Sequence, residues 1–212
     1  MTWKVPVQAT IAYYGTSLTT GRLSTFWVED FTKELMACPE AIGPIVVYNM
    51  GKGSQNSNWG LANANFIANL RPKIIISEGF GINSAIEIGG TPQVTLSQHI
   101  VNMQGMHDMW KAADPNVDII WQSMNDVGAE GAYLRPYLRS FYEAEKAKAA
   151  LMGDRFLDNF SRWPHPMPPV LTQDGDLLHP TEIGTDMFLK PYVLLETRKA
   201  LARLYGLEEP VA

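Results

Sequence analysis

The chain has 212 residues, of which 46% are hydrophobic and 18% are charged. This length suits one domain with a sizeable core, and the composition excludes collagen-like, low-complexity and disordered chains. The 17 basic and 22 acidic residues give a formal charge of -5, and the basic residues are scattered along the chain. That pattern excludes a nucleic-acid-binding protein that contacts the phosphate backbone along a basic surface. No apolar run approaches the ~18 residues of a membrane-spanning helix.

The cysteine content and the first residues bear on the cellular compartment. Cys38 is the only cysteine, so the chain cannot form an internal disulfide. The start, Met-Thr-Trp-Lys-Val-Pro, lacks the basic and then apolar layout of a secretory signal. By default we expect a cytoplasmic protein that acts on a small-molecule or carbohydrate ester, binds no nucleic acid and does not span a membrane. The oligomeric state is left open.

Strand-like and helix-like segments alternate in the first half of the chain. Residues 5–15 are mostly apolar and end at a glycine, which is typical of a strand buried on both faces. Ser24 can cap the next segment, where apolar residues recur at helical spacing until Pro39 forbids continuation. The next predicted elements are a strand at 45–49, a helix at 58–70 and a strand at 74–79.

The same alternation continues in the second half. A loop with Gly89, Gly90 and Pro92 precedes a predicted helix at 96–113 and a strand at 117–124. Pro136 fits the first turn of a further helix, and a short fifth strand is predicted at 155–160. The chain ends in a proline-rich loop at 163–169 and a helix at 181–205 that we expect to be kinked at Pro191.

The alternation predicts a three-layer α/β/α sandwich with a parallel, flavodoxin-like sheet of about five strands. No linker divides the chain, so we expect a single domain over residues 1–212. In open parallel sheets ligands bind beyond the carboxyl ends of the strands. The residues that directly follow the predicted strands are therefore the candidates for chemistry.

A serine, a histidine and an acid can meet at this edge. Ser17 follows the first predicted strand, and a loop before the last helix carries Asp176 and His179. A serine hydroxyl is a weak nucleophile that needs an adjacent base, itself oriented by a third group. The Asp-x-x-His spacing lets Asp176 bind one ring nitrogen while the other faces Ser17. Asp174 is the rival acid.

Acyl transfer also needs donors for the negatively charged oxygen of the tetrahedral intermediate. Gly53 and Ser54 lie in a glycine-rich turn after the second predicted strand, and Asn83 follows the third. The backbone N–H of Ser17, a backbone N–H of the Gly53-Ser54 turn and the side-chain amide of Asn83 are suitable donors. Whether Gly53 or Ser54 provides the second donor is open.

Four segments of the chain, taken in order, resemble the four sequence blocks of the SGNH, or GDSL, hydrolases. These segments are Gly-Thr-Ser-Leu at 15–18, the glycine-rich turn after Asn49, Gly-Ile-Asn at 81–83 and Asp-Leu-Leu-His at 176–179. The resemblance covers nearly the whole chain. It implies an esterase or lipase of flavodoxin-like fold, without a metal or organic cofactor, in which Ser17, Asp176 and His179 are catalytic.

The chain also departs from the family pattern. Thr16 and Ser84 stand where the family has aspartates, although neither aspartate is the proton-relay residue, so local hydrogen bonding is what they affect. Ser54 falls where the family has its oxyanion glycine, with Gly53 one residue earlier. These departures leave open an alternative in which the chain is a catalytically silent carbohydrate- or acyl-binding module on the same fold.

The main expectation is a serine esterase for short-acyl esters, including acetylated carbohydrates. The polar, glycine-rich loops at 52–59 and 81–90 would offer hydrogen bonds around the nucleophile rather than a long apolar channel. A second alternative is a nucleotide-binding flavodoxin-like protein. The glycines after the first strand are too few for a phosphate cradle.

Other polar residues have less specific interpretations. His107 shares a helix face with apolar residues, so we expect a hydrogen-bonded histidine in or near the core. His99 and His165 have no partner pattern. Asn125 follows the fourth predicted strand, which is the wrong one for the oxyanion role, and is interpreted as a turn residue with a part in substrate contact.

Overall fold

A five-stranded parallel sheet forms the centre of the computed structural model, which describes residues 8–21, 27–173 and 178–211. The sheet has the strand order β2-β1-β3-β6-β7. Its strands are β1 (Ala9–Gly15), β2 (Ile45–Gly51), β3 (Ile74–Ser77), β6 (Asp118–Gln122) and β7 (Arg155–Leu157). This is the flavodoxin-like order, so the predicted sheet is confirmed.

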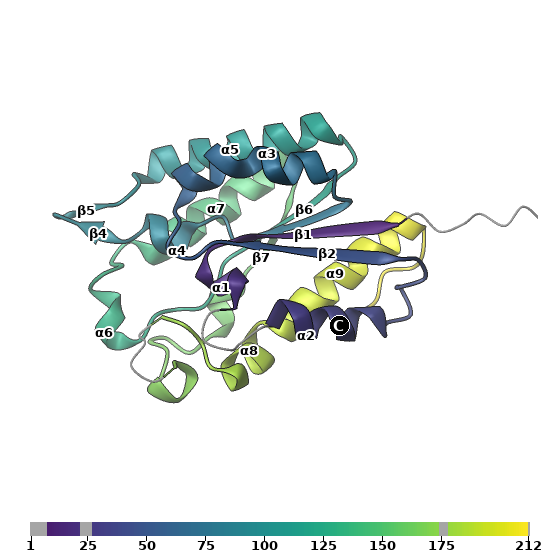
Figure 1. Cartoon of the computed structure of the whole chain (residues 1–212). Helices are drawn as coiled ribbons and strands as arrows, with labels where there is room; N and C mark the ends of the chain where they lie inside the picture. The colour runs from purple at the N-terminus through teal and green to yellow at the C-terminus, as the bar shows by residue number, and fades with distance from the viewer. Residues whose placement is uncertain (1–7, 22–26, 174–177, 212) are drawn as a thin grey trace, which may run out of the picture.

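Helices cover both faces of the sheet (Figure 1). One face carries α3 (Ser57–Leu70), α5 (Leu96–Ala113) and α7 (Leu138–Met152), and the other carries α2 (Trp27–Met36) and α9 (Lys190–Tyr205). The three-layer α/β/α sandwich is therefore confirmed. That residues 1–212 form one domain stays a prediction.

The central strand β1 faces two cores. Ile11 and Tyr13 are buried in the core shared with α2 and α9, and Tyr13 meets Trp27 edge-on with ring centroids 5.6 Å apart. Ala12 and Tyr14 point the other way, into the core shared with α3 and α5. A strand buried on both faces has no polar face, and this explains the continuous apolar run in the sequence.

Several short elements at the carboxyl edge of the sheet were not predicted (Figure 1). They are the helical turns α1 (Ser17–Thr20), α4 (Gly81–Ser84) and α6 (Ala129–Ala132), and the hairpin strands β4 (Glu87–Ile88) and β5 (Thr91–Pro92). Gly89 and Gly90 form the hairpin turn with φ of +62° and +85°, a left-handed conformation that glycine adopts without steric cost.

The predicted final helix is in fact two helices, α8 (Glu182–Phe188) and α9, with the break at Leu189. Pro191 lies in the first turn of α9, where a missing N–H costs nothing, so the chain breaks before the proline instead of bending at it. The strands β3, β6 and β7 are also shorter than predicted. Ser24, expected to cap α2, and residues 5–7 of the first predicted strand lie outside the described residues.

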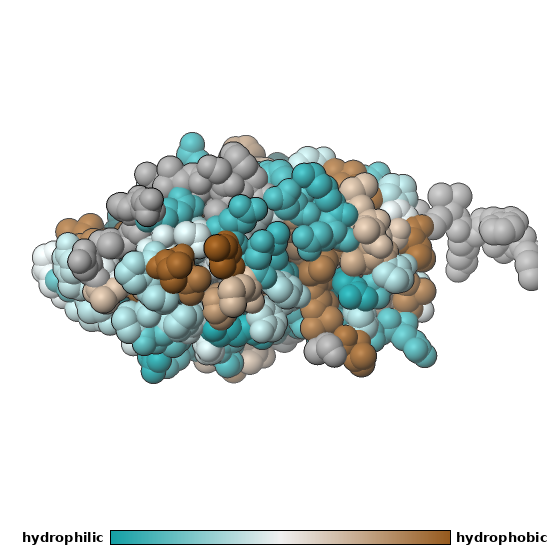
Figure 2. All heavy atoms as spheres, turned by 90° about the horizontal axis from the view of Figure 1, so that it is seen from below, coloured by the Kyte–Doolittle hydropathy of each residue, from teal (hydrophilic) through white to brown (hydrophobic). Residues whose placement is uncertain are grey.

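Figure 2 shows the molecule from the side of α2 and α8, where hydrophilic side chains dominate and apolar ones gather in separate places. Exposed apolar side chains of these helices are Met36, Ile183 and Met187. Within the described part of the chain, no helix is long and apolar enough to cross a membrane.

Candidate active site

Ser17 and His179 meet although 162 residues separate them in the chain. Ser17 begins α1 directly beyond the end of β1, and the Thr16 hydroxyl caps α1 by accepting the Leu18 N–H at 3.3 Å. His179 lies on the segment before α8. Its Nε2 is 2.8 Å from Ser17 Oγ, a hydrogen-bond distance, and both residues are buried, at 4% and 7% exposure. A histidine is therefore positioned to take the serine proton.

The third predicted member of the triad is an aspartate on the segment before His179. Asp176 and the rival Asp174 lie outside the described residues, which resume at Leu178. The orienting role of Asp176 stays a prediction.

Asn83 joins the turn after β3 to the turn after β2. It lies on α4, is 4% exposed, and its Nδ2 donates to the Gln55 carbonyl at 2.9 Å. An amide nitrogen carries two N–H groups, and this bond uses one of them. The strands β1 and β3 are neighbours, and β2 lies on the other side of β1, so Ser17 and Asn83 flank the topological switch point where ligands bind in such sheets.

The turn after β2 packs against the Ser17 turn. Lys52 N–H donates to the Gly15 carbonyl at 2.8 Å, and a Cβ at Gly51 would collide with the backbone of Thr20. A Cβ at Gly53 would lie 3.7 Å from Ser17 Cβ, which places Gly53 beside the predicted nucleophile.

Ser54, the other predicted donor, is exposed and has a φ of +61°, in the left-handed region that favours glycine. The structure thus places Gly53 beside Ser17, and Asn83 contacts the same turn after β2 through the Gln55 carbonyl. Which backbone N–H would bind an oxyanion stays a prediction.

The two residues that replace family aspartates have local hydrogen-bonding roles. Thr16 caps α1, as described above. Ser84 Oγ accepts the Ser57 N–H at 3.1 Å and lies 3.2 Å from the Ser57 hydroxyl, so it fixes the start of α3.

Asn125 supports the histidine segment. It is 1% exposed, and its Nδ2 donates to the Leu178 carbonyl at 2.7 Å and to the Asp126 carbonyl at 2.7 Å. Leu178 directly precedes His179, so Asn125 ties the turn after β6 to the segment that carries the base. The sequence indicates a turn residue here but gives no sign of this contact.

The histidines outside the site are paired with acids. His107 Nδ1 is 2.8 Å from Asp154 Oδ2, as expected for a hydrogen-bonded histidine at the core boundary. The other two have no partner pattern in the sequence, but the structure pairs each of them with an acid. His99 Nε2 is 2.9 Å from Glu145 Oε1, and His165 Nδ1 is 2.8 Å from Asp126 Oδ2. These partners are 46 and 39 residues away in the chain, which is why no local pattern reveals them.

Glu78 is a buried acid that sequence reasoning passed over. It directly follows β3, is 1% exposed, and accepts the Thr16 backbone N–H at Oε1. Burial raises the pKa of Glu78, the hydrogen bond from Thr16 opposes this rise and the charge of Glu145 adds to it, so that the pKa is about 8. The available signal was a charged residue at the end of an otherwise apolar strand.

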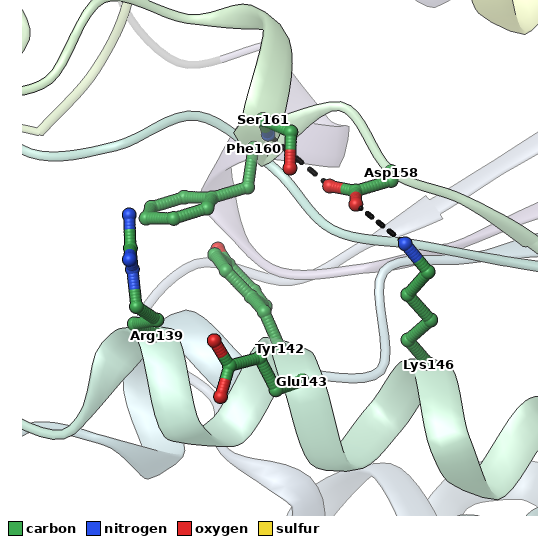
Figure 3. A pocket seen from close by; sticks show the side chains of 7 residues that line it. All are labelled: Arg139, Tyr142, Glu143, Lys146, Asp158, Phe160 and Ser161. Atoms are coloured by element: carbon green, nitrogen blue, oxygen red, sulfur yellow. Dashed lines mark hydrogen bonds and ion pairs between the residues drawn. The ribbon is translucent and has the colours of Figure 1, made fainter.

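A separate hollow of about 270 Å³ lies between α7 and the segment after β7 (Figure 3). Both of its cationic side chains already have partners within the hollow. Lys146 Nζ is 3.0 Å from Asp158 Oδ2, and the Arg139 guanidinium lies 6.0 Å from the centre of the Phe160 ring. Ser17 does not line it. Nowhere in the described ranges do three His, Cys, Asp or Glu side chains converge to hold a metal ion.

The sequence matches no protein-family model and no curated protein. Solved structures, in contrast, share the fold over nearly the whole chain. A candidate acylhydrolase from Bacteroides fragilis has a TM-score of 0.71 at 20% identity, with 93% of this chain and 91% of that one covered.

Two further structures agree with it. A GDSL-like lipase from Bacteroides thetaiotaomicron has a TM-score of 0.66 at 20% identity, with 92% and 88% covered. A catalytic mutant of an acetylxylan esterase from Geobacillus stearothermophilus has a TM-score of 0.66 at 17% identity, with 99% of both chains covered. The chain therefore has the fold of the GDSL-type hydrolases, as the resemblance of its sequence blocks implied.

Proposed function

We propose that the protein is a serine esterase that acts through an acyl-enzyme on Ser17. The observation that carries this proposal is the 2.8 Å distance between Ser17 Oγ and His179 Nε2, in a buried pair at the switch point of the sheet. The fold shared with esterases and lipases supports it. Fold alone would not, because one fold hosts many activities.

In the first half of the reaction Ser17 Oγ attacks the ester carbonyl carbon, and its proton passes to His179 Nε2. The tetrahedral intermediate collapses when His179 returns that proton to the oxygen of the leaving alcohol, which leaves the acyl group on Ser17. In the second half a water molecule attacks the acyl carbon and gives its proton to His179. The second tetrahedral intermediate collapses when His179 returns this proton to Ser17 Oγ and the bond between Oγ and the acyl carbon breaks, which releases the carboxylic acid and restores the Ser17 hydroxyl.

The negative charge of each tetrahedral intermediate needs fixed donors. We assign this role to the backbone N–H of Ser17, the backbone N–H of Gly53 and the second N–H of the Asn83 amide. Ser54 N–H is the alternative to Gly53. Asp176 is assigned to orient the His179 ring, in keeping with the Asp-x-x-His spacing.

For the substrate we propose a short acyl group, such as acetyl, on a polar alcohol that includes sugars. Gly53 of the turn after β2 lies beside Ser17, and the Asn83 amide after β3 contacts that same turn. The likeness to an acetylxylan esterase agrees with a carbohydrate alcohol. A site that cannot enclose a long chain forgoes ~0.8 kcal/mol of burial for each added CH₂. We expect kcat/KM for nitrophenyl esters to be highest for acetate and to fall steeply toward palmitate, whereas a maximum for the long esters would assign a lipase.

Ser17→Ala and His179→Ala test the mechanism. Each should abolish nearly all hydrolysis of nitrophenyl acetate. The double variant should be about as inactive as either single variant, because the two groups act as a unit. Ser140→Ala, at an exposed serine of α7, is the matched control and should turn over like the wild type. Wild-type turnover by Ser17→Ala would overturn the proposal.

A further inference from the structure

Two buried glutamates lie behind the proposed active site without a part in the mechanism above. Glu78 directly follows β3, and Glu145 lies on α7; both side chains are about 1% exposed. A buried carboxyl group is costly unless hydrogen bonds or a partner compensate its lost hydration. The contacts of these two side chains are therefore informative about their role.

Glu78 contacts the turn that carries the nucleophile. Thr16, the residue before Ser17, donates its backbone N–H to Glu78 Oε1. A Cβ at Gly15 would collide with the Glu78 side chain and with the Thr19 hydroxyl, so the carboxyl group packs directly against both ends of the turn. This contact fixes the path of the backbone on either side of Ser17.

Glu145 contacts the turn that carries Asn83. A Cβ at Gly79 or at Gly81 would lie 2.5 Å from Glu145 Oε1, so the carboxyl group packs directly against this turn. Burial raises the pKa of Glu145, and a hydrogen bond from the Gly81 backbone lowers it by less. Glu145 is itself held by His99, whose Nε2 is 2.9 Å away. Gly81 begins α4, the helical turn that presents the Asn83 amide.

We propose that Glu78 and Glu145 are positioning residues, which hold the Ser17 turn and the Asn83 turn in the relative placement that ester hydrolysis requires. Full turnover further requires an uncharged Glu78. This inference rests on the proposed function, because it concerns the placement of the same nucleophile and oxyanion donor.

The charge state of Glu78 depends on the groups that face it. Burial, and the charge of Glu145 beside it, favour the protonated form, and the pKa of Glu78 is about 8. Tyr142 of α7 faces both glutamates, and Arg135 faces Tyr142. Near neutral pH Glu78 is mainly protonated, and its carbonyl oxygen can still accept the Thr16 N–H.

Ionisation of Glu78 places a negative charge behind the turn where the oxyanion forms. Like charges in a poorly solvated site repel, so the tetrahedral intermediate is disfavoured when Glu78 is ionised. Turnover should therefore fall as the pH rises through about 8, the pKa of Glu78.

The test is to measure kcat and KM separately for nitrophenyl acetate from pH 6 to 9.5, corrected for spontaneous hydrolysis. Glu78→Leu removes the acceptor at similar size and should lower kcat about 10²-fold with little change in KM, the cost of a ~1 Å misplacement of reacting groups. Glu78→Gln keeps an acceptor oxygen, so it should recover most of that loss and should lack the alkaline fall of the wild type. Glu143→Gln, at an exposed glutamate of α7, is the control and should keep the alkaline fall.

An alkaline fall in Glu78→Gln equal to that of the wild type overturns the inference, as does a wild-type kcat in Glu78→Leu. Thermal unfolding shows whether Glu78→Leu is folded. If it is not, the pH dependence of kcat in Glu78→Gln decides alone. A wild type that hydrolyses no ester, or that Ser17→Ala does not inactivate, overturns the proposed function and this inference together. The two failures are thus distinguishable.

Discussion

The amide of Asn83 is the one oxyanion donor that a substitution can remove cleanly, because the other proposed donors are backbone groups. We expect Asn83→Ala to lower kcat roughly 10²–10³-fold, the usual cost of one missing donor, with a smaller effect on KM. Steady-state kinetics on a short ester checks this. Asn116→Ala, at an exposed asparagine before β6 and so at the opposite edge of the sheet, is the control. An unchanged kcat in Asn83→Ala would remove Asn83 from the site.

The turn after β2 has Ser54 where the sequence block that it resembles has a glycine. Its φ of +61° is unfavourable for any residue with a Cβ, so Ser54→Gly should raise the free energy of unfolding by about 1 kcal/mol. Activity should be equal or higher, since only a backbone N–H is needed there. Ser54→Ala keeps the Cβ and is the control for the hydroxyl group. A large loss of activity in both variants would show that the hydroxyl acts directly.

For individual residues, short motifs could be predicted from the sequence and tertiary contacts could not. Ser17, Asn83 and His179 follow from short motifs at strand ends and before the last helix, where local sequence suffices. The contact of Glu78 with Thr16 and that of His99 with Glu145 depend on how distant helices and turns pack. No local spacing encodes such contacts.

The turn after β6 is the element that supports the histidine segment. Asn125→Ala would remove the part-buried hydrogen bonds to the Leu178 and Asp126 carbonyls, and with them the connection to the histidine segment. We expect kcat to fall about tenfold to 10²-fold through displacement of His179, while short-ester KM changes less. The same measurement on Asn116→Ala is the control, and wild-type kinetics in Asn125→Ala would show that this contact does not position His179.

Element length decides what the sequence could predict. Helices such as α3 and α5 span several turns, so their apolar periodicity is visible in the sequence. The four-residue turn α4 and the two-residue strands of the β4–β5 hairpin are too short for any period. These short elements surround the candidate site, and this is why its immediate walls could not be predicted, whereas Ser17 and His179, which the structure brings together, belong to short sequence motifs.

The stability of the whole molecule should depend on pH through Glu78. Its folded-state pKa of about 8 is above the ordinary 4.5 of a glutamate, so the native state retains a proton that the unfolded chain releases. Its contribution to stability is thus full below about pH 4.5 and is lost as the pH rises through about 8. Glu145, whose pKa burial also raises, acts in the same direction.

Glu78→Gln, which cannot ionise, isolates this effect. Between pH 5.5 and 8.5 the free energy of unfolding should fall more for the wild type than for Glu78→Gln, as measured by urea unfolding at each pH. Glu143→Gln should follow the wild type. Equal slopes in the wild type and Glu78→Gln would contradict the assigned protonation of Glu78.

At the scale of the molecule, the sequence was sufficient for the layers and the sheet. Strands buried on both faces alternate with helices, and this pattern leaves few topologies besides the observed order β2-β1-β3-β6-β7. The switch point beside β1 then places the turns that carry Ser17 and Asn83 at one edge. The return of His179 to that edge was expected only from its motif, since a loop position has no periodic signal.

A serine-directed phosphonate tests whether His179 activates Ser17 as a nucleophile. Folded wild-type protein is incubated with the reagent, and the adduct is located by peptide mass spectrometry. We expect one adduct per chain, on Ser17, which forms much more slowly in His179→Ala and at the wild-type rate in Ser140→Ala. Absence of an adduct on Ser17 in the folded wild type would show that Ser17 is not an activated nucleophile and would favour a catalytically silent binding module.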